Sequence, residues 1–291
     1  LQIIFMTEAA AEQPKAQEDI PMIEALKQRH STRNFSKEEW PEEKQQFVEQ
    51  IVKEVNARPK LLGRDSVEIV VAPTGFGLLN FIVNENGWLL AKMKVESEDD
   101  NRNDTYIEAA FMLQYCLMKM TQKNIATCWI AGTYSRSRCE EFCGGNCAVP
   151  GVVAFGGEDQ DRWLDSVVKW FGSWRGKNQY KDKFYDLKEQ KPITEETAGE
   201  REDICMVINK IPCAMKPHSY RIVFDEPRIH VFDTGSSGPY KSMNYFDVGN
   251  VFANIWLYLE EKGKTPKFER MEHPESPFEK DAEYIGTVIT E

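Results

Sequence analysis

Two arginines, a histidine and a serine lie within five consecutive positions near the start of the chain: Arg29, His30, Ser31 and Arg33. Guanidinium groups donate paired hydrogen bonds that match phosphate or a planar anionic group, and a hydroxyl adds another donor. Each residue alone has an ordinary explanation, because cations are favoured at a helix C-terminus and serine is common in turns. Together they favour an anion-binding segment.

The charge of the whole chain makes such a segment a local exception. Its 291 residues include 36 basic and 47 acidic side chains, a formal net charge of -11, so the chain repels polyanions and we expect no nucleic-acid partner. No apolar run approaches the roughly 20 residues that span a bilayer, and no signal peptide is evident. We therefore expect a cytoplasmic protein without membrane association, and reduced thiols in its seven cysteines.

Hydrophobic periodicity predicts the elements that position these side chains. A helix begins near Met22, a second covers 41–55, and two nearly all-apolar segments, 105–120 and 245–264, predict buried central helices. Asn86-Gly87, between two apolar runs, predicts a tight hairpin turn. Strands are predicted at 66–72, 149–157, 219–224, 228–232 and 284–290.

The two predicted central helices resemble each other when the chain is shifted by 139 positions. Tyr106 then matches Tyr245, and Ala110 matches Gly249. Buried helices often resemble one another by chance, but here the preceding elements also keep the same order, which favours an internal duplication. We predict a disordered tail at 1–19, a first repeat at 20–158, a basic connecting segment at 159–199 and a second repeat at 200–291.

Four segments resemble the FMN-dependent nitroreductase superfamily: "ALKQRHSTRNF", "TCWIAG", "VPGVVAFGG" and "IPCAMKPHSYRIVF". Their distribution over both halves is similar to the duplicated, TM1586-like branch. This resemblance implies an α+β nitroreductase-like fold with two pseudo-symmetric halves, each with a mainly antiparallel sheet packed on a buried central helix. It also implies a monomer that mimics a dimer around one composite FMN site, with further self-association left open.

The resemblance also implies roles for individual residues. Arg29 and Ser31 would face the FMN phosphate and ribityl chain, His30 would lie along the same wall, and Arg33 would approach the flavin N1/C2 carbonyl edge. The remaining residues implied to bind FMN are Trp129, Ile130, Ala131 and Gly132 beside the ring, Pro212, Cys213, Ala214, Met215 and Lys216 around the cofactor, and the phosphate candidates Arg175, Lys177, Lys181 and Lys183, among which the sequence does not choose.

The implied function is an FMN-dependent oxidoreductase that passes electrons from NAD(P)H to nitroaromatics, quinones or similar flat acceptors by ping-pong turnover. The flavin carries the redox chemistry, so no catalytic side chain is expected, and we expect no metal despite the spacing of Cys139, Cys143 and Cys147. Lys216 and His218 depart from the family pattern, which leaves a non-catalytic flavin- or ligand-binding protein as the alternative. Other flavin chemistry, the acceptor, and the choice of NADH or NADPH stay open.

Overall fold

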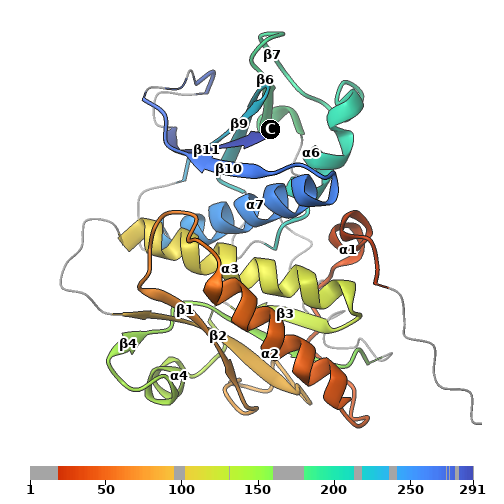
Figure 1. Ribbon diagram of the computed structural model, residues 1–291, viewed down its shortest axis with the longest axis vertical. Helices are drawn as coiled ribbons and strands as arrows, with labels where there is room; N and C mark the ends of the chain where they lie inside the picture. Colours follow the sequence, from red (N-terminus) through yellow and green to blue (C-terminus); the bar gives the residue numbers. More distant parts are fainter. Residues whose placement is uncertain are drawn as a thin grey trace, which may run out of the picture.

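The computed structural model describes residues 19–94, 102–130, 132–159, 180–212, 218–235, 241–272, 274, 276–278 and 282–290. Two sheets enclose two long helices, α3 (Arg102–Gln122) and α7 (Lys241–Glu261), which lie side by side between them (Figure 1). The predicted tail lies outside the described residues except for Asp19. Within those residues, no helix is both long enough and apolar enough to cross a membrane.

The first sheet has the strand order β1-β2-β5-β3, and a short strand, β4, also pairs with β2. All of its pairs are antiparallel. Two helices flank it, α2 (Glu42–Ala57) and α4 (Arg136–Phe142) (Figure 1). The strands are β1 (Val67–Ala72), β2 (Gly87–Lys94), β3 (Ala126–Ile130), β4 (Cys147–Ala148) and β5 (Val152–Gly156).

The tight turn predicted at Asn86-Gly87 is wrong, because β2 begins at Gly87 and pairs with β1 instead. The backbone N–H of Asn86 donates to the carbonyl of Phe155 (2.8 Å). A Cβ on Gly87 would come within 2.5 Å of the Phe155 ring. The glycine therefore permits close packing between strands rather than a two-residue turn.

The second sheet has the order β10-β11-β9-β8-β6-β7, and only the β6–β8 pair is parallel. The predicted connecting segment 159–199 contains strands β6 and β7, which belong to the second sheet. The Ile222 N–H donates to the Lys183 carbonyl (2.7 Å), next to the parallel pairing of β6 with β8. The elements of this half are η1 (Tyr180–Asp182), β6 (Phe184–Asp186), β7 (Lys191–Pro192), η2 (Gly199–Arg201), α6 (Glu202–Asn209), β8 (Tyr220–Asp225), β9 (Arg228–Asp233), β10 (Pro266–Glu269) and β11 (Glu283–Thr290).

The halves repeat one arrangement. In each, two strands form an antiparallel pair, a long helix follows, and two more strands return so that the last pairs with the second: β1-β2-β5-β3 and β8-β9-β11-β10. The long helices approach closely where a Cβ on Gly249 would lie 2.6 Å from the Cβ of Ala110, a pair of positions 139 apart. The predicted fold class and both buried helices are confirmed, and the layout is compatible with duplication.

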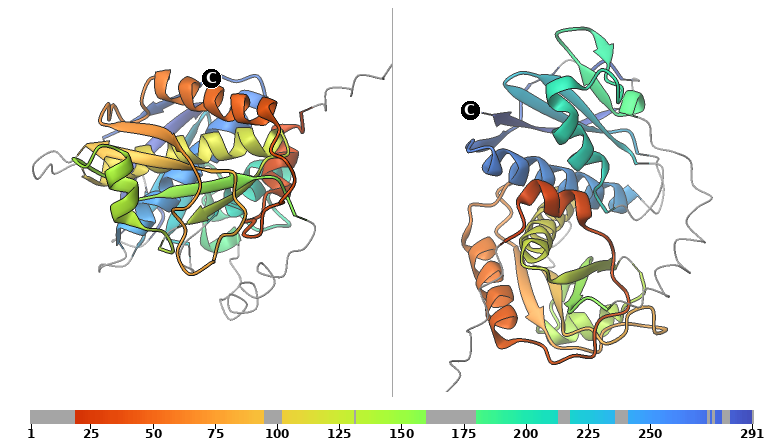
Figure 2. Two further views of the ribbon diagram at one scale, coloured as in Figure 1. Left: turned by 90° about the horizontal axis from the view of Figure 1, so that it is seen from below. Right: turned by 90° about the vertical axis from the view of Figure 1, so that its right-hand side faces the viewer.

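Helix α1 (Met22–Gln28) lies at the junction of the halves (Figure 2). It starts after Pro21 without a side-chain cap of its own. The N–H groups of Met22 and Ile23 instead donate to the carboxylate of Glu261, at the end of α7 (2.6 and 2.7 Å). An acidic group is favourable at a helix N-terminus, so the second half fixes the helix that leads into Arg29.

Candidate active site

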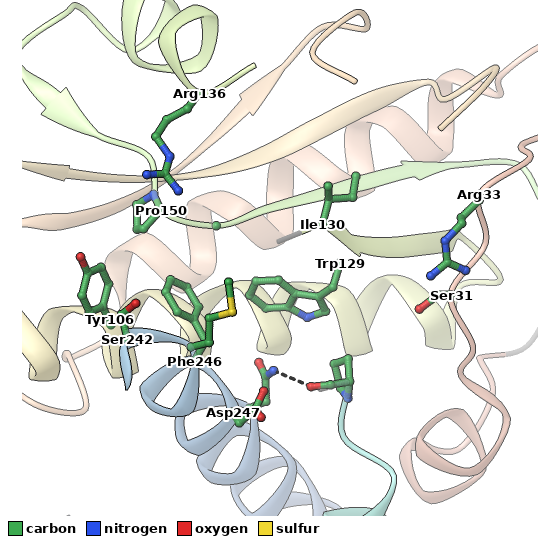
Figure 3. Close-up of a pocket in the computed structure, with 14 residues that line it drawn as sticks. Ser31, Arg33, Tyr106, Trp129, Ile130, Arg136, Pro150, Ser242, Phe246 and Asp247 are labelled. Atoms are coloured by element: carbon green, nitrogen blue, oxygen red, sulfur yellow. Dashed lines mark hydrogen bonds between the residues drawn. The ribbon is translucent and has the colours of Figure 1, made fainter. Parts of the chain in front are cut away.

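A cavity of about 340 Å³ lies between the halves (Figure 3). The first half contributes the segment after α1, the start of α3, the end of β3, the start of α4 and the residues before β5. The second half contributes Pro212 and the N-terminal turns of α7. Pockets of this size between subunits or domains are common ligand sites. The lining residues are Ser31, Arg33, Tyr106, Trp129, Ile130, Arg136, Pro150, Gly151, Pro212, Ser242, Met243, Phe246, Asp247 and Asn250.

The segment after α1 separates the four residues of the anion-binding motif. It runs extended beside β3, with the Thr32 N–H donating to the Thr127 carbonyl (3.0 Å). Alternate side chains of an extended segment point to opposite sides. Ser31 and Arg33 accordingly line the large cavity, whereas His30 and Thr32 line a separate cavity of about 80 Å³. Arg29, at the C-terminal end of α1, also lines this smaller cavity.

The Arg29 guanidinium is buried, and its pKa is perturbed. Burial lowers that pKa to about 10. Its Nη1 atom is buried and has no hydrogen-bond partner in the described part of the chain. Neighbouring His30 places Nε2 3.2 Å from Glu158 Oε1. A buried donor without a partner costs free energy, so an anion beside Arg29 would be favourable.

A chain of buried hydrogen bonds holds Trp129 in the cavity wall. The indole Nε1 donates to Gln114 of α3 (2.9 Å), whose amide donates to Asn254 of α7 (2.9 Å). The Asn254 amide then donates to the Val207 carbonyl of α6 (2.8 Å). The ring plane is therefore fixed by both central helices. A further cavity of about 210 Å³ shares Trp129, Ile130 and Arg33 with the first.

Asn250 lines the large cavity and carries a buried acceptor without a partner among the described residues. Its side chain is buried, and its Nδ2 donates to the Pro212 carbonyl (3.1 Å), a bond drawn in Figure 3. Its Oδ1 is buried and accepts no hydrogen bond from the described residues. Because a buried acceptor without a donor is unfavourable, a ligand N–H or O–H that reached Oδ1 would be favoured.

The structure brings only some of the predicted cofactor residues together. Ser31, Arg33, Trp129, Ile130 and Pro212 line the large cavity. Gly132 is exposed and outside that lining. Seven other predicted residues lie outside the described chain: Ala131, Arg175, Lys177, Cys213, Ala214, Met215 and Lys216.

The two described phosphate candidates differ in burial, and neither lines the large cavity. Lys181 is exposed in η1. Lys183 is buried, and its ammonium contacts Asn209 Oδ1 and lies 3.1 Å from His218 Nδ1 and 3.4 Å from Tyr220 OH. Asn209 and His218 stand before and after the segment that carries Pro212, so Lys183 ties the two ends of that segment together.

Sequence reasoning missed nine residues of the cavity lining. Tyr106 and Asp247 were visible only in the match at 139 positions, where they pair with Tyr245 and Glu108. Pro150 and Gly151 belong to the motif "VPGVVAFGG", for which no binding role was predicted, and no motif contained the others. The missed residues are Tyr106, Arg136, Pro150, Gly151, Ser242, Met243, Phe246, Asp247 and Asn250.

The cysteines with regular spacing are buried around α4, and burial raises the pKa of Cys139 to about 12 and that of Cys143 to about 11. Thiols with such raised pKa values remain protonated near neutral pH, and a metal site would need thiolates. Within the described residues, no three His, Cys, Asp or Glu side chains are grouped to hold a metal ion.

The fold and the composite cavity define a nitroreductase-like protein. The model of the family described as "Putative TM nitroreductase" matches residues 21–258, and the chain belongs to this family. Family membership supports an oxidoreductase.

Two solved structures are similar to this chain, and the first of them supports the fold. One described as a putative nitroreductase (tm1586) from Thermotoga maritima is 14% identical, with a TM-score of 0.60 and coverage of 97% of this chain and 98% of that chain. A putative NAD(P)H:FMN oxidoreductase from Staphylococcus epidermidis is also 14% identical, with a TM-score of 0.42, over 50% of this chain and 92% of that chain. No curated protein matches the chain.

Proposed function

We propose that the chain is an FMN-dependent oxidoreductase that transfers electrons from NAD(P)H to nitroaromatics, quinones or similar flat acceptors by ping-pong turnover. The observation that supports it most is the pairing of a buried unsatisfied acceptor, Asn250 Oδ1, with the cation Arg33 in one aromatic-walled cavity. The pyrimidine edge of a flavin carries an N–H donor between two carbonyl acceptors. An amide acceptor and a guanidinium are the types of group that can bind such an edge.

The residues of this chain would bind and tune FMN rather than react with substrate. Asn250 would accept from the ring N–H, Arg33 would stabilise negative charge at the N1/C2 edge, and Trp129 would form a rigid wall. Bound FMN would supply the redox chemistry, taking hydride from NAD(P)H and delivering electrons to the acceptor. Since both walls come from one chain, a monomer would suffice.

The alternative is a flavin- or ligand-binding protein without turnover. One observation favours it: Arg29 and His30 lie on a smaller cavity than Ser31 and Arg33, so the four residues do not converge on one volume. The unsatisfied Arg29 donor could bind the phosphate of FMN only if the ring occupies the large cavity and the phosphate extends into the smaller cavity.

An anaerobic absorption spectrum of purified protein supplemented with FMN and desalted tests the proposal. We expect a flavin band that bleaches on adding NADPH or NADH, followed by reoxidation with a nitroaromatic or quinone. A retained band that neither nicotinamide bleaches would favour the binding protein. Absence of any retained flavin would overturn both forms of the proposal.

Variants connect the spectrum to the cavity. Arg33→Ala and Arg29→Ala should each weaken FMN binding by about tenfold or more, because each removes a charge-assisted donor. Quenching of FMN fluorescence measures the dissociation constant. The control is Arg138→Ala, since Arg138 is exposed on α4 and donates instead to the Gly75 carbonyl (2.6 Å). Equal weakening in all three variants would contradict the placement.

A further inference from the structure

A second cation lines the large cavity at the end opposite Arg33. Figure 3 shows Arg136, at the start of α4, beside Pro150 and on the same side of the cavity as Tyr106. Arg33 and Ser31 lie at the other end, beyond Trp129. The two guanidinium groups are thus separated by the aromatic part of the lining, and one bound group need not occupy both.

A buried hydroxyl holds the Arg136 guanidinium in place. Tyr134 is buried, and its hydroxyl donates to the Val149 carbonyl (2.7 Å). The same hydroxyl accepts a hydrogen bond from Arg136, which raises the pKa of that guanidinium. A guanidinium carries five N–H donors, so this contact orients the group and leaves others for a ligand.

Arg136 also differs from Arg58 and Arg201, two arginines of this acidic chain that form ion pairs. Arg58 pairs with Glu260 (3.0 Å) and Arg201 with Glu226 (2.9 Å). Arg136 forms no ion pair with a carboxylate within 4.0 Å among the described residues, although the charge of Glu140 adds to the rise of its pKa. An arginine held by a neutral group at the edge of a ligand cavity is suited to bind an anionic group that enters from solution.

The walls beside Arg136 favour a flat ring. The Phe246 ring lies 5.5 Å from Tyr106 and 6.2 Å from Trp129, measured between centroids. Aromatic walls bind planar ligands by offset or edge-on contacts. A carboxylate on such a ring would receive two parallel hydrogen bonds from a guanidinium, a geometry that a neutral substituent reproduces poorly.

We propose that Arg136 makes the cavity selective for planar aromatic acceptors that carry a carboxylate. This inference rests on the proposed function, because that proposal makes the cavity the site where the electron acceptor binds. The inference itself concerns only how tightly the acceptor binds. Arg136 contacts the carboxylate, and the aromatic lining holds the ring to which it is attached.

Ligands that differ only in charge test it. Benzoate and benzamide have nearly the same shape, and their affinities for the FMN-supplemented full chain can be measured by calorimetric titration. We expect wild type to bind benzoate about tenfold more tightly than benzamide, the range of one charge-assisted contact at a partly exposed site. Arg136→Gln should abolish that preference without changing the affinity for benzamide. The matched control Arg138→Gln, two residues further along α4, should retain the preference for benzoate.

Kinetics separate this inference from the proposed function. With 4-nitrobenzoate and 4-nitrobenzamide as acceptors, Arg136→Gln should raise KM for the carboxylate about tenfold with little change in kcat. A benzoate preference that depends on Arg136 in a protein that reduces neither acceptor would overturn the proposed function alone. Equal binding of the two ligands, no binding of either, or a preference lost in Arg33→Gln but kept in Arg136→Gln would overturn the inference.

Discussion

Positions 139 residues apart lie in opposite surroundings in the two halves. Tyr106 lines the large cavity, whereas Tyr245 is buried, with its hydroxyl between Asn103 (3.0 Å) and Glu283 (3.1 Å). A second pair of positions 139 residues apart, Trp129 and Phe268, differs in the same way. Trp129 lines the large cavity, whereas Phe268 packs edge-on against Phe252, with centroids 5.4 Å apart. One position is open and its counterpart is filled by side chains.

The polar groups follow the same division. In the filled position, Glu108 accepts from the N–H groups of Leu61 and Leu62 (3.0 and 2.7 Å). In the open position, the counterpart Asp247 lines the cavity beside Asn250, whose Oδ1 has no partner in the described chain. The comparison teaches that equivalent positions of a repeated framework can differ, because one lines a cavity while the other is packed among side chains.

The largest expected effect concerns the helix crossing that both positions share. A Cβ on Gly249 would lie 2.4 Å from the Ile107 carbonyl and 2.6 Å from the Ala110 Cβ. Gly249→Ala should therefore lower the free energy of unfolding by about 3 kcal/mol through overpacking. Urea unfolding followed by circular dichroism measures it. Gly132→Ala is the control, because nothing lies within 4 Å of the new Cβ there, and equal losses would contradict the close crossing.

The next effect tests whether the filled position is held by ion pairs. Asp104 receives two hydrogen bonds from Arg270 (2.9 and 2.6 Å) and one from Arg64 (3.3 Å). Asp104→Asn should lower the free energy of unfolding by about 2 kcal/mol, less than for a fully buried pair because solvent reaches Arg270. Asp65→Asn, at an exposed neighbour, is the control and should change it little.

The same variant has a defined pH dependence. Burial acts to raise the pKa of Asp104, but the hydrogen bonds from Arg270 and Arg64 outweigh it and lower the pKa below 3.8. A carboxylate with a lowered folded-state pKa stabilises the protein above its unfolded-state pKa and loses that effect as pH falls. The difference between wild type and Asp104→Asn should therefore shrink below about pH 4. A difference that grows with acid would refute the assignment.

The smallest effect concerns Glu108. An amide oxygen in Glu108→Gln can replace one of the two carboxylate contacts, so we expect a loss of about 1 kcal/mol at pH 4. Burial raises the pKa of Glu108, which means that its contribution is present at low pH and declines as pH rises above 4.5. The stability difference between the variant and wild type should therefore shrink toward neutral pH, as measured by thermal unfolding. Glu200→Gln, on an exposed residue, should show no such trend.

Sequence reasoning predicted the elements whose own residues already require burial, whatever they pack against. The segments of α3 and α7 are apolar on nearly all sides, and such helices can only be stable inside a core. The hairpin at Asn86-Gly87 was mispredicted because a local turn signal cannot report that Gly87 packs on Phe155, a residue far along the chain. Asn250 was missed for a related reason, since an asparagine in an apolar helix has no local signature of ligand binding.

The anion-binding motif shows the same limit at the site itself. The types and order of Arg29, His30, Ser31 and Arg33 were sufficient to suggest the family, which is confirmed. Their division between two cavities depends on the extended backbone after α1, which the bond from Thr32 to Thr127 stabilises. A sequence motif specifies neither that backbone conformation nor the side of β3 on which each residue lies.

The sequence by itself determined the two central helices, the repeated order of elements and the residues that identify the family, because apolar periodicity and short motifs are local properties. The tertiary structure alone decided which of two equivalent positions is open. At the filled position, long-range contacts such as the one between Asp104 and Arg270 close the space, whereas at the open position side chains such as Trp129 line a cavity. Such contacts join residues more than a hundred positions apart, and their free energies exist only once the halves have packed together.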